Sequence, residues 1–296
     1  MSVTRIVTIT NPAPAPPAPA TVYDLADLAT VKSELTIADD NTADDAWFSR
    51  QITRTSRMIM QYCNRVFQVE GLSEIDYIQQ DPFPYQLPGS LVALALTRWP
   101  LVNWTSLPAA ATVYAGTVLP FAATAGITTG MSVAGVGIAV GTTVESFDSA
   151  SVTLTQPITA SVLQGATILF GFTLLQGVDA YTTQPLTYGK DYTIDPRFGF
   201  LYRLNPFTGV QMTWEPLAIS TSYSAGYPAV PDDVQEACVE LVVSRYRSRG
   251  RDPYLKAIEQ PGLGIQTYWV GGPPKSGSMP IDIAALLDAY RVPVVI

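Results

Sequence analysis

The sequence predicts an α+β protein, in which a small helical bundle is combined with an antiparallel β-sheet and an inserted all-β domain. Two segments, 42–65 and 231–250, carry apolar residues at helical spacing. The segment 172–223 alternates short apolar runs with turn residues, which is typical of antiparallel strands. The block 108–171 has very few charges and is rich in glycine and threonine, which favours a separate β-domain.

Composition limits the functions that this chain of 296 residues can have. Its length allows one substantial core or two smaller ones. The net charge of -8 argues against a general phosphate-neutralising surface, although local basic patches are compatible with it. Histidine is absent, which excludes histidine-dependent triads and the usual zinc ligands. We therefore expect no enzyme and no catalytic, cofactor-binding or metal-binding residues.

The N-terminal arm comprises residues 1–21. Its first ten residues, MSVTRIVTIT, suit a short strand, and the proline-alanine tract that follows suits a semi-rigid spacer. The apolar run is too short and too rich in threonine for a secretion signal. Two interpretations remain open: a disordered leader, or an arm that docks on a neighbouring molecule.

Two helices are expected in the first quarter of the chain. The shorter one spans 23–35, and the longer one begins at Thr42, where Thr42 and Asp45 are placed as a capping box. Cys63 in this helix and Cys238 further on lack the spacing of a disulfide framework or a zinc site. We interpret both as buried thiols in a reducing compartment.

Two more helices are expected near the C-terminus. The first has Pro231 and two aspartates in its opening turn and ends at Gly250. The second spans 279–291, behind a loop rich in glycine and proline, and we expect it to dock away from its own core. The two long helices should bury their apolar stripes against each other. These stripes are Phe48, Ile52, Ile59 and Cys63 in one helix and Val234, Ala237, Cys238, Leu241 and Val242 in the other.

The stretch ITTGMSVAGVGIAVGTTV, residues 127–144, allows three interpretations. A membrane span is disfavoured because glycine interrupts the stretch every few residues. A phosphate-binding loop is disfavoured because a strand pattern, 142–155, follows the glycines where a helix N-terminus is needed. A β-domain remains, with paired apolar positions on short strands: Met131 and Val133, Ile138 and Val140, Val152 and Leu154, Ile168 and Phe170.

The sheet is expected from 91–107 and 172–223. Strands are predicted at Tyr192 and Ile194, at 200–204, at 210–214 and at 219–223, with turns at the two intervening Asp-Pro and Asn-Pro pairs.

Four arginines lie at the end of the third helix pattern: Arg245, Arg247, Arg249 and Arg251. They could contact DNA or a negatively charged partner, or they could form a solvated helix end that the helix dipole favours. The tryptophans are scattered along the chain, which favours core or interface packing over a sugar-binding platform.

The order of these elements resembles the head-tail connector, or adaptor, proteins of tailed bacteriophages and gene transfer particles. The first matching segment is 28–65, LATVKSELTIADDNTADDAWFSRQITRTSRMIMQYCNR. The second is YGKDYTIDPRFGFLYRL with ISTSYSAGYPAVPDDVQEACVELVVSRYRSR, where a strand ending in Ala-Gly-Tyr runs through Pro-Asp-Asp into a long helix. The third runs from GIQTYWVGG to MPIDIAALLDAYRVP. The N-terminal arm and the uncharged block depart from the family pattern.

The resemblance implies a structural virion protein, made in the host bacterial cytoplasm. Its copies would form a ring, commonly of twelve subunits, that extends the DNA channel beneath the portal and joins the capsid to the neck or tail. The expected partners are other copies of the chain, the portal protein, and a neck, stopper or tail protein. DNA would only pass through, and no membrane is involved. The alternative is a phage tail or surface β-protein that binds host glycans; a carboxylate-dependent hydrolase ranks third.

The expected division of the chain follows from these patterns. The arm is 1–21, the connector core is 22–107 with 172–262, the inserted β-domain is 108–171, and the docking segment is 263–296. We expect partner contacts from the arginines named above and from the C-terminal segment. The positions in that segment are Leu286, Leu287, Tyr290, Val294 and Ile296.

Overall fold

The contacts in a computed structural model divide the chain into two compact units, which we call the β-unit (1–13 and 69–228) and the helical unit (14–68 and 229–296). The structure describes residues 2–11, 23–79, 93–177, 183–249, 257–260, 264–267 and 279–292.

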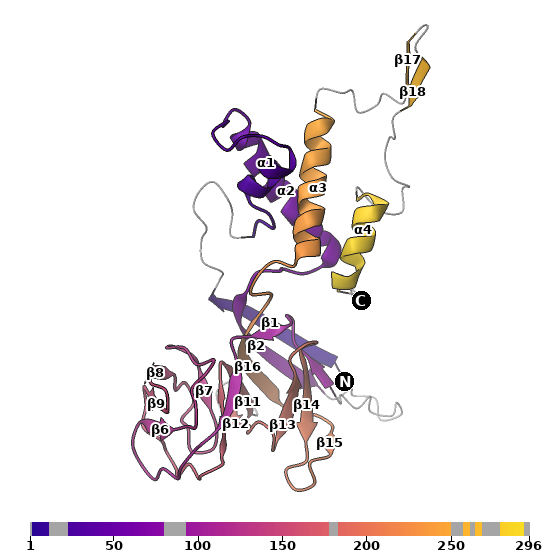
Figure 1. Cartoon of the computed structure of the whole chain (residues 1–296). Coiled ribbons are helices and arrows are strands. Elements are labelled where there is room, and N and C mark those ends of the chain that lie inside the picture. Colours follow the sequence, from indigo (N-terminus) through magenta and orange to yellow (C-terminus); the bar gives the residue numbers. More distant parts are fainter. Residues whose placement is uncertain are drawn as a thin grey trace, which may run out of the picture. The chain divides into compact units, whose positions relative to one another are not determined.

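The helical unit contains α1 (Leu28–Glu34), α2 (Asp45–Cys63), α3 (Asp232–Arg247), α4 (Ile281–Leu287) and the short 3₁₀ helix η1 (Asp288–Tyr290). It also contains a hairpin of β17 (Ala257–Gln260) and β18 (Gly264–Thr267), which the sequence did not predict. Figure 1 shows α3 flanked by α2 and α4, and α3 contacts both helices.

The two predicted helical stripes form the core of this unit. All nine of their residues are buried, and α2 contacts α3 directly. Near the middle of the helices the Ser56 hydroxyl and the Cys238 thiol lie 3.7 Å apart, and at one end the rings of Phe48 and Tyr246 lie 4.9 Å apart. This packing agrees with the rule that two amphipathic helices bury their apolar faces together.

The predicted capping box at the start of α2 is wrong. The helix begins at Asp45, its N-cap is Asp44, and no side chain caps it. The Asp45 carboxylate instead forms an ion pair with the ammonium group of Lys32, at 2.7 Å. Lys32 is only 3% exposed, so its charge needs a carboxylate partner, and this demand outweighs capping. The first helix is also shorter than expected, since Asp27 caps it by accepting a hydrogen bond from the Thr30 amide.

The β-unit is built from antiparallel sheets. The largest has the order β1-β2-β16-β11-β12, and β4 also pairs with β16. Its strands are β1 (Ser2–Asn11), β2 (Glu70–Gln79), β4 (Leu101–Val102), β11 (Phe172–Gly177), β12 (Thr183–Pro185) and β16 (Ala218–Ala225). A second sheet contains β3 (Ala93–Ala95), β13 (Tyr192–Asp195), β14 (Phe200–Leu204) and β15 (Gln211–Met212). The two sheets share one core that includes Tyr192, Leu201, Trp214 and Ile219.

The uncharged block forms a β-module with its own core. Its strands are β5 (Thr105–Pro108), β6 (Val118–Pro120), β7 (Val133–Ala134), β8 (Val144–Phe147), β9 (Ser151–Leu154) and β10 (Thr167–Phe170). The first and last of these pair with each other, Pro108 opposite Thr167 and Thr105 opposite Phe170. A separate cluster of buried residues, including Leu119, Val152 and Phe170, fills the interior. The chain therefore enters and leaves the module at one place.

One predicted strand of the module is absent. Ile138 is buried but Val140 is 53% exposed, and the segment that holds them forms turns. Gly137 and Gly141, with φ of 81° and 82°, place the backbone in a left-handed conformation on both sides, which bends the chain. A strand, β8, follows these glycines, so the geometry of a phosphate-binding loop is also absent here. Among the described helices none is long and apolar enough to cross a membrane.

The contacts divide the chain differently from the expected domains. The expected connector core combined helices and sheet, whereas the helices form one unit and the sheets another. The arm does not stand alone, because β1 pairs along its length with β2 of the same chain. The C-terminal segment belongs to the helical unit, where the Val292 amide donates to the Cys63 carbonyl at 2.9 Å.

Candidate functional site

A basic groove lies on the exposed side of α2. Arg50, Arg54 and Arg57 are separated by four and three residues, so they project from one side of the helix, opposite its buried stripe. They line a groove of about 570 Å³ together with Arg245 of α3 and the side chains of Ser49, Thr53, Met58 and Gln61. The three α2 arginines are exposed and form no ion pair with any residue that the structure describes. The groove therefore offers several guanidinium groups to an anionic partner.

Arg245 is the innermost cation of the basic groove. Its guanidinium donates to the Thr55 hydroxyl at 3.1 Å and to the Gln51 amide oxygen at 3.4 Å, and both acceptors are neutral. Burial lowers the pKa of Arg245, and the positive charge of Arg54 lowers it further. Two cations lie near each other without a carboxylate between them, so a bound anion would be stabilised here.

An acidic groove lies on the other flank of α3. Glu34, Glu240 and Asp282 line it, from α1, α3 and the first turn of α4, and its volume is about 610 Å³. All three carboxylates are exposed, and none forms an ion pair with a described residue. Arg247 shares this groove. Arg245 and Arg247 are two residues apart, about 200° around the helix, so consecutive arginines of α3 face different grooves.

The structure places the predicted arginines in different environments. Arg245 and Arg247 line the two grooves, whereas Arg249 pairs with Asp44 at 2.5 Å and lies over the ring of Trp47 at 5.3 Å. The hydrogen bond from Arg249 holds the pKa of the Asp44 carboxyl below its ordinary value. Arg249 therefore ties the end of α3 to the start of α2. Arg251 lies outside the described residues.

The predicted C-terminal contact residues also lie in different environments. Leu287 is fully buried within the helical unit, and the ring of Tyr290 packs against Phe67 with centroids 6.0 Å apart. The Tyr290 hydroxyl donates to Asp233 at 3.1 Å. These two residues hold α4 and η1 on their own unit, so they are not free for a partner in this arrangement. Leu286 is 38% exposed and stays available. Val294 and Ile296 lie outside the described residues.

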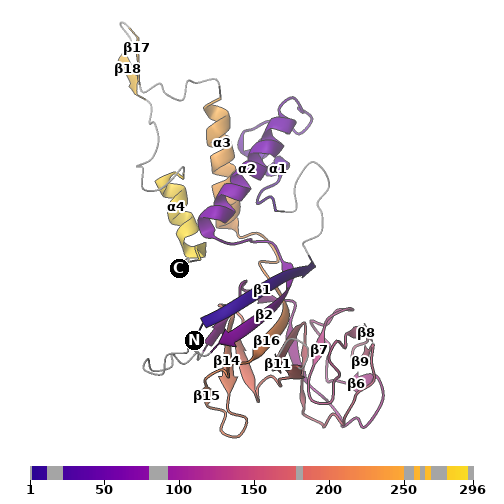
Figure 2. The ribbon, with the colours of Figure 1, turned by 180° about the vertical axis from the view of Figure 1, so that it is seen from behind.

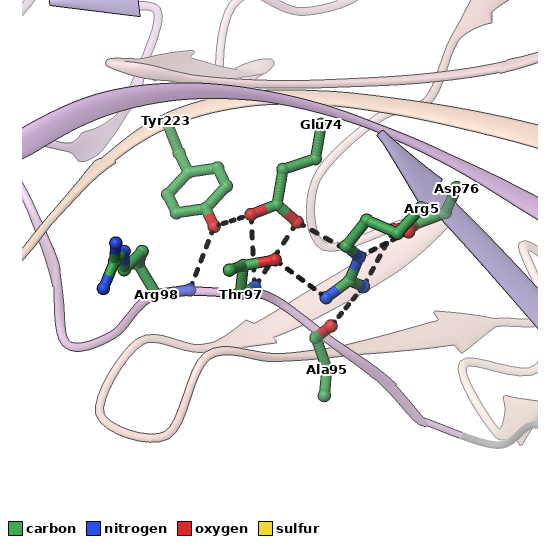
Figure 3. A network of polar contacts seen from close by, with 7 residues as sticks. All are labelled: Arg5, Glu74, Asp76, Ala95, Thr97, Arg98 and Tyr223. Carbon is green, nitrogen blue, oxygen red and sulfur yellow. Dashed lines mark hydrogen bonds and ion pairs between the residues drawn. The ribbon is translucent and has the colours of Figure 1, made fainter. Parts of the chain in front are cut away.

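A buried polar network links β1 to the sheet (Figure 3). The Arg5 guanidinium donates to both carboxylate oxygens of Asp76, at 2.6 and 3.0 Å, and lies 3.6 Å from Glu74. Glu74 also accepts hydrogen bonds from the Thr97 amide at 3.2 Å and from the Tyr223 hydroxyl. The side chains of Glu74 and Asp76 are fully buried.

Burial and neighbouring charges shift the pKa values of two members of this network, Arg5 and Tyr223. Burial alone would lower the pKa of Arg5, but the hydrogen bond to Asp76 and the charges of Asp76 and Glu74 outweigh it and leave that pKa above its ordinary value. Burial and the charge of Glu74 raise the pKa of Tyr223, so its hydroxyl remains a donor. This network could not be predicted from the sequence, because its members come from four separate segments.

Three of the tryptophans make contacts within the described parts of the chain. Trp214 is buried and donates to the Leu201 carbonyl at 3.3 Å, Trp104 packs against Tyr188, and Trp47 packs against Phe48 and Tyr246. No group of histidine, cysteine, aspartate and glutamate side chains that could hold a metal ion occurs in these parts.

No family model and no curated protein matches this chain. Two solved structures are similar over 98% of this chain and 97% of theirs. One is the neck of an empty gene transfer agent (GTA) particle, at 13% identity, and the other is the virion of a native gene transfer agent particle, at 14% identity. The TM-score is 0.37 in both cases, which does not establish a shared fold.

Proposed function

We propose that this protein is a structural component of a phage-like virion, without catalytic activity. Its copies form a connector ring beneath the portal, which extends the DNA channel and joins the capsid to the neck or tail. The sequence resemblance supports this role, and its most specific segment has a definite structure. The strand β16 ends at Ala225, and α3 begins at Asp232, directly after Pro231.

The observation that carries the proposal is the pair of oppositely charged grooves on two flanks of α3. A closed ring needs a heterologous interface, in which one surface of each copy meets a different surface of the next. The basic groove and the acidic groove are two such surfaces, and both leave their charges unpaired within the described chain. Each copy would present its basic groove to the acidic groove of its neighbour.

The charge of the chain also suits a channel that DNA only crosses. With a net charge of -8, the protein lacks the general basic surface that would hold a passing duplex. The arginines of the basic groove would be neutralised by the neighbouring copy, so they would not retain DNA. The number of subunits, commonly twelve in the family that the sequence resembles, belongs to this proposal.

Exposed apolar side chains of α4 supply a contact for the portal or for an adjacent copy. Ile281 is 54% exposed and Leu286 is 38% exposed, while Ile283 and Leu287 are buried. Exposed apolar residues on a short docked helix favour coverage by another protein. They narrow the proposed C-terminal docking segment, 263–296, to α4 within its described part.

Charge reversal tests the ring interface. Arg54→Glu makes the basic groove less positive, and Glu240→Arg makes the acidic groove less negative, so each variant alone should fail to form rings in negative-stain electron microscopy. Lys190→Glu and Glu145→Arg, exposed positions in the β-unit with the same changes of charge, serve as controls and should assemble normally.

Mixing the two variants gives the sharper result. In an alternating ring, the basic groove with Arg54→Glu in one variant meets the acidic groove with Glu240→Arg in the other, and the two unchanged grooves meet as well. An equimolar mixture should therefore restore rings. Normal assembly of either single variant, or failure of the mixture, would contradict the proposed interface. Imaging of particles tests the wider role, since the ring should lie at the neck.

A further inference from the structure

We propose that β1 exchanges between copies: the N-terminal strand of one molecule occupies the edge of β2 in its neighbour. The partner is thus a second copy of this chain, and the contact lies in the β-unit. The proposal does not depend on the helical grooves or on a virion role, because it would apply to any association of copies.

The position of β1 makes it separable from the rest of the sheet. Figure 2 shows β1 lying along β2, and in the order of the sheet it is the terminal strand. Its register with β2 runs from Ser2 opposite Gln79 to Asn11 opposite Gly71. The apolar side chains of β1 are poorly covered, with exposed fractions of 37% for Val3, 39% for Val7 and 46% for Ile9. Apolar burial therefore contributes little to holding the strand.

Arg5 supplies a specific anchor. It reaches from β1 to two fully buried carboxylates of β2, Glu74 and Asp76 (Figure 3). Without β1, the edge of β2 would be unpaired, and Asp76 would lose the guanidinium that contacts both of its oxygens. Buried charges without a partner are strongly unfavourable. The β-unit therefore contains an acceptor slot that requires a strand carrying an arginine at this register.

The connection behind β1 permits the strand to come from another molecule. The strand belongs to the β-unit, but the chain passes into the helical unit after residue 13. The sequence between β1 and the helical elements, 12–22, is mostly proline and alanine, a composition that favours extended spacers.

Exchange leaves the local contacts unchanged. β1 makes the same hydrogen bonds with β2, and Arg5 makes the same ion pairs, whether the strand comes from its own chain or from a neighbour. Whether β1 pairs within its chain or exchanges therefore depends on the local protein concentration and on the spacer. In a closed assembly each copy gives one strand and receives one, and every slot is filled. The exchanged strand would then add a second link between copies.

Site-specific disulfides distinguish exchange from pairing within one chain. Thr8 lies directly opposite Ser73 in the β1–β2 register, and both positions are at least partly exposed. One preparation of the full chain carries Thr8→Cys with a size tag, and the other carries Ser73→Cys. The two are unfolded, mixed, refolded together and oxidised at high protein concentration. The native thiols, Cys63 and Cys238, are buried and should not interfere.

Exchange predicts a disulfide-linked heterodimer on a non-reducing gel. A partner with Glu145→Cys, an exposed position away from β1, measures random cross-linking and should give only a small fraction of heterodimer. Adding Arg5→Ala to the donor chain should reduce the heterodimer about tenfold or more, because the buried carboxylates lose their partner. Adding Arg197→Ala, an arginine of the same unit outside the network, should leave the yield unchanged.

Two results would overturn the proposal. One is a heterodimer yield no higher than that of the Glu145→Cys partner, while a chain with both Thr8→Cys and Ser73→Cys forms its internal disulfide fully. The other is a heterodimer whose yield is insensitive to Arg5→Ala, since the anchor would then play no part. Absence of the helical-groove interface would not affect either outcome.

Discussion

Removal of the β-module should leave both units folded. Pro108 and Thr167 lie opposite each other on paired strands, so residues 109–166 can be replaced by Asn-Gly, the usual sequence of a two-residue hairpin turn. Ile168 and Phe170 face the module's own core and would become exposed, so the variant also carries Ile168→Thr and Phe170→Thr to keep it soluble. The shortened connection lowers the entropy cost of closing this loop.

The expected loss of stability follows from the contacts that the module shares with the sheets. Ala134 of the module packs against the main core of the β-unit, and its removal costs about 1 kcal/mol for one methyl group. The Gly171 amide loses its bond to the Ser132 carbonyl, at 2.8 Å, and β10 loses its short pairing with β7. At about 1 kcal/mol for each of one or two net hydrogen bonds, the total is about 2 to 3 kcal/mol. A domain with typical stability survives such a loss.

Urea denaturation followed by tryptophan fluorescence and far-UV circular dichroism measures this change. The buried Trp214 reports on the β-unit, and the helical signal reports on α2 and α3. A variant that keeps the helical signal and unfolds cooperatively, about 2 to 3 kcal/mol below the parent chain, agrees with the reasoning. Loss of the fluorescence signature of a buried tryptophan without denaturant would refute it, because the module would then be part of the main core.

Four further predictions concern individual side chains and glycine. Gly171→Ala should destabilise the β-unit by about 2 kcal/mol or more in urea denaturation, because φ is 77° and an added Cβ would lie 2.0 Å from a carbonyl oxygen. Burial raises the pKa of Cys63 and Cys238 to about 11, so at pH 8 both thiols should react with a disulfide reagent about 100-fold more slowly than an exposed thiol. The helical unit should also lose stability as pH rises from about 9 towards 11, since thiols in the unfolded chain release their protons first. Leu287→Ala should cost about 2 to 5 kcal/mol in thermal or urea unfolding, whereas Leu286→Ala, at a partly exposed position, should cost less than about 1 kcal/mol.

Local sequence patterns correctly predicted the helices and strands that bury one face against a single nearby part of the chain. The second long helix was expected from Pro231 to Gly250 and spans Asp232–Arg247, and the strands expected at 192–194 and 200–204 are present. In these elements the period of apolar residues and the turn residues suffice, because each buries one face against a nearby part of the chain. The α+β class followed from the same patterns.

The arrangement of β2 could not be predicted in this way. Along this strand Glu74 and Asp76 are fully buried, while Ile75 and Tyr77 are only partly buried, so the pattern of polar and apolar residues opposes the actual burial. The reason is that Arg5 arrives from a distant segment and supplies the charge that makes burial of the carboxylates tolerable. A pairing across such a distance leaves no periodic signal.

The part of the basic groove that lies on α2 could have been predicted from a local sequence pattern. The spacing of Arg50, Arg54 and Arg57 places all three on one side of α2, and this can be read from the sequence alone. Their proximity to Arg245 depends on how α2 and α3 pack, which only the structure provides. Likewise, the acidic groove unites Glu34 with residues more than two hundred positions away.

The distribution of paired and unpaired charges separates structural roles from surface roles. The chain is only 14% charged, and in the β-unit several of its arginines are used internally, as with Arg5 on Asp76 and Arg203 near Asp191. The helical unit also uses charges internally, at Lys32 and Arg249. Yet its two grooves hold charges of one predominant sign each, without ion pairs among the described residues. Since like charges gathered on one surface destabilise an isolated molecule, a groove of this kind is best explained by a partner of opposite charge. In the proposed ring, a neighbouring copy would supply that partner for both grooves at once, which no single external anion or cation could do.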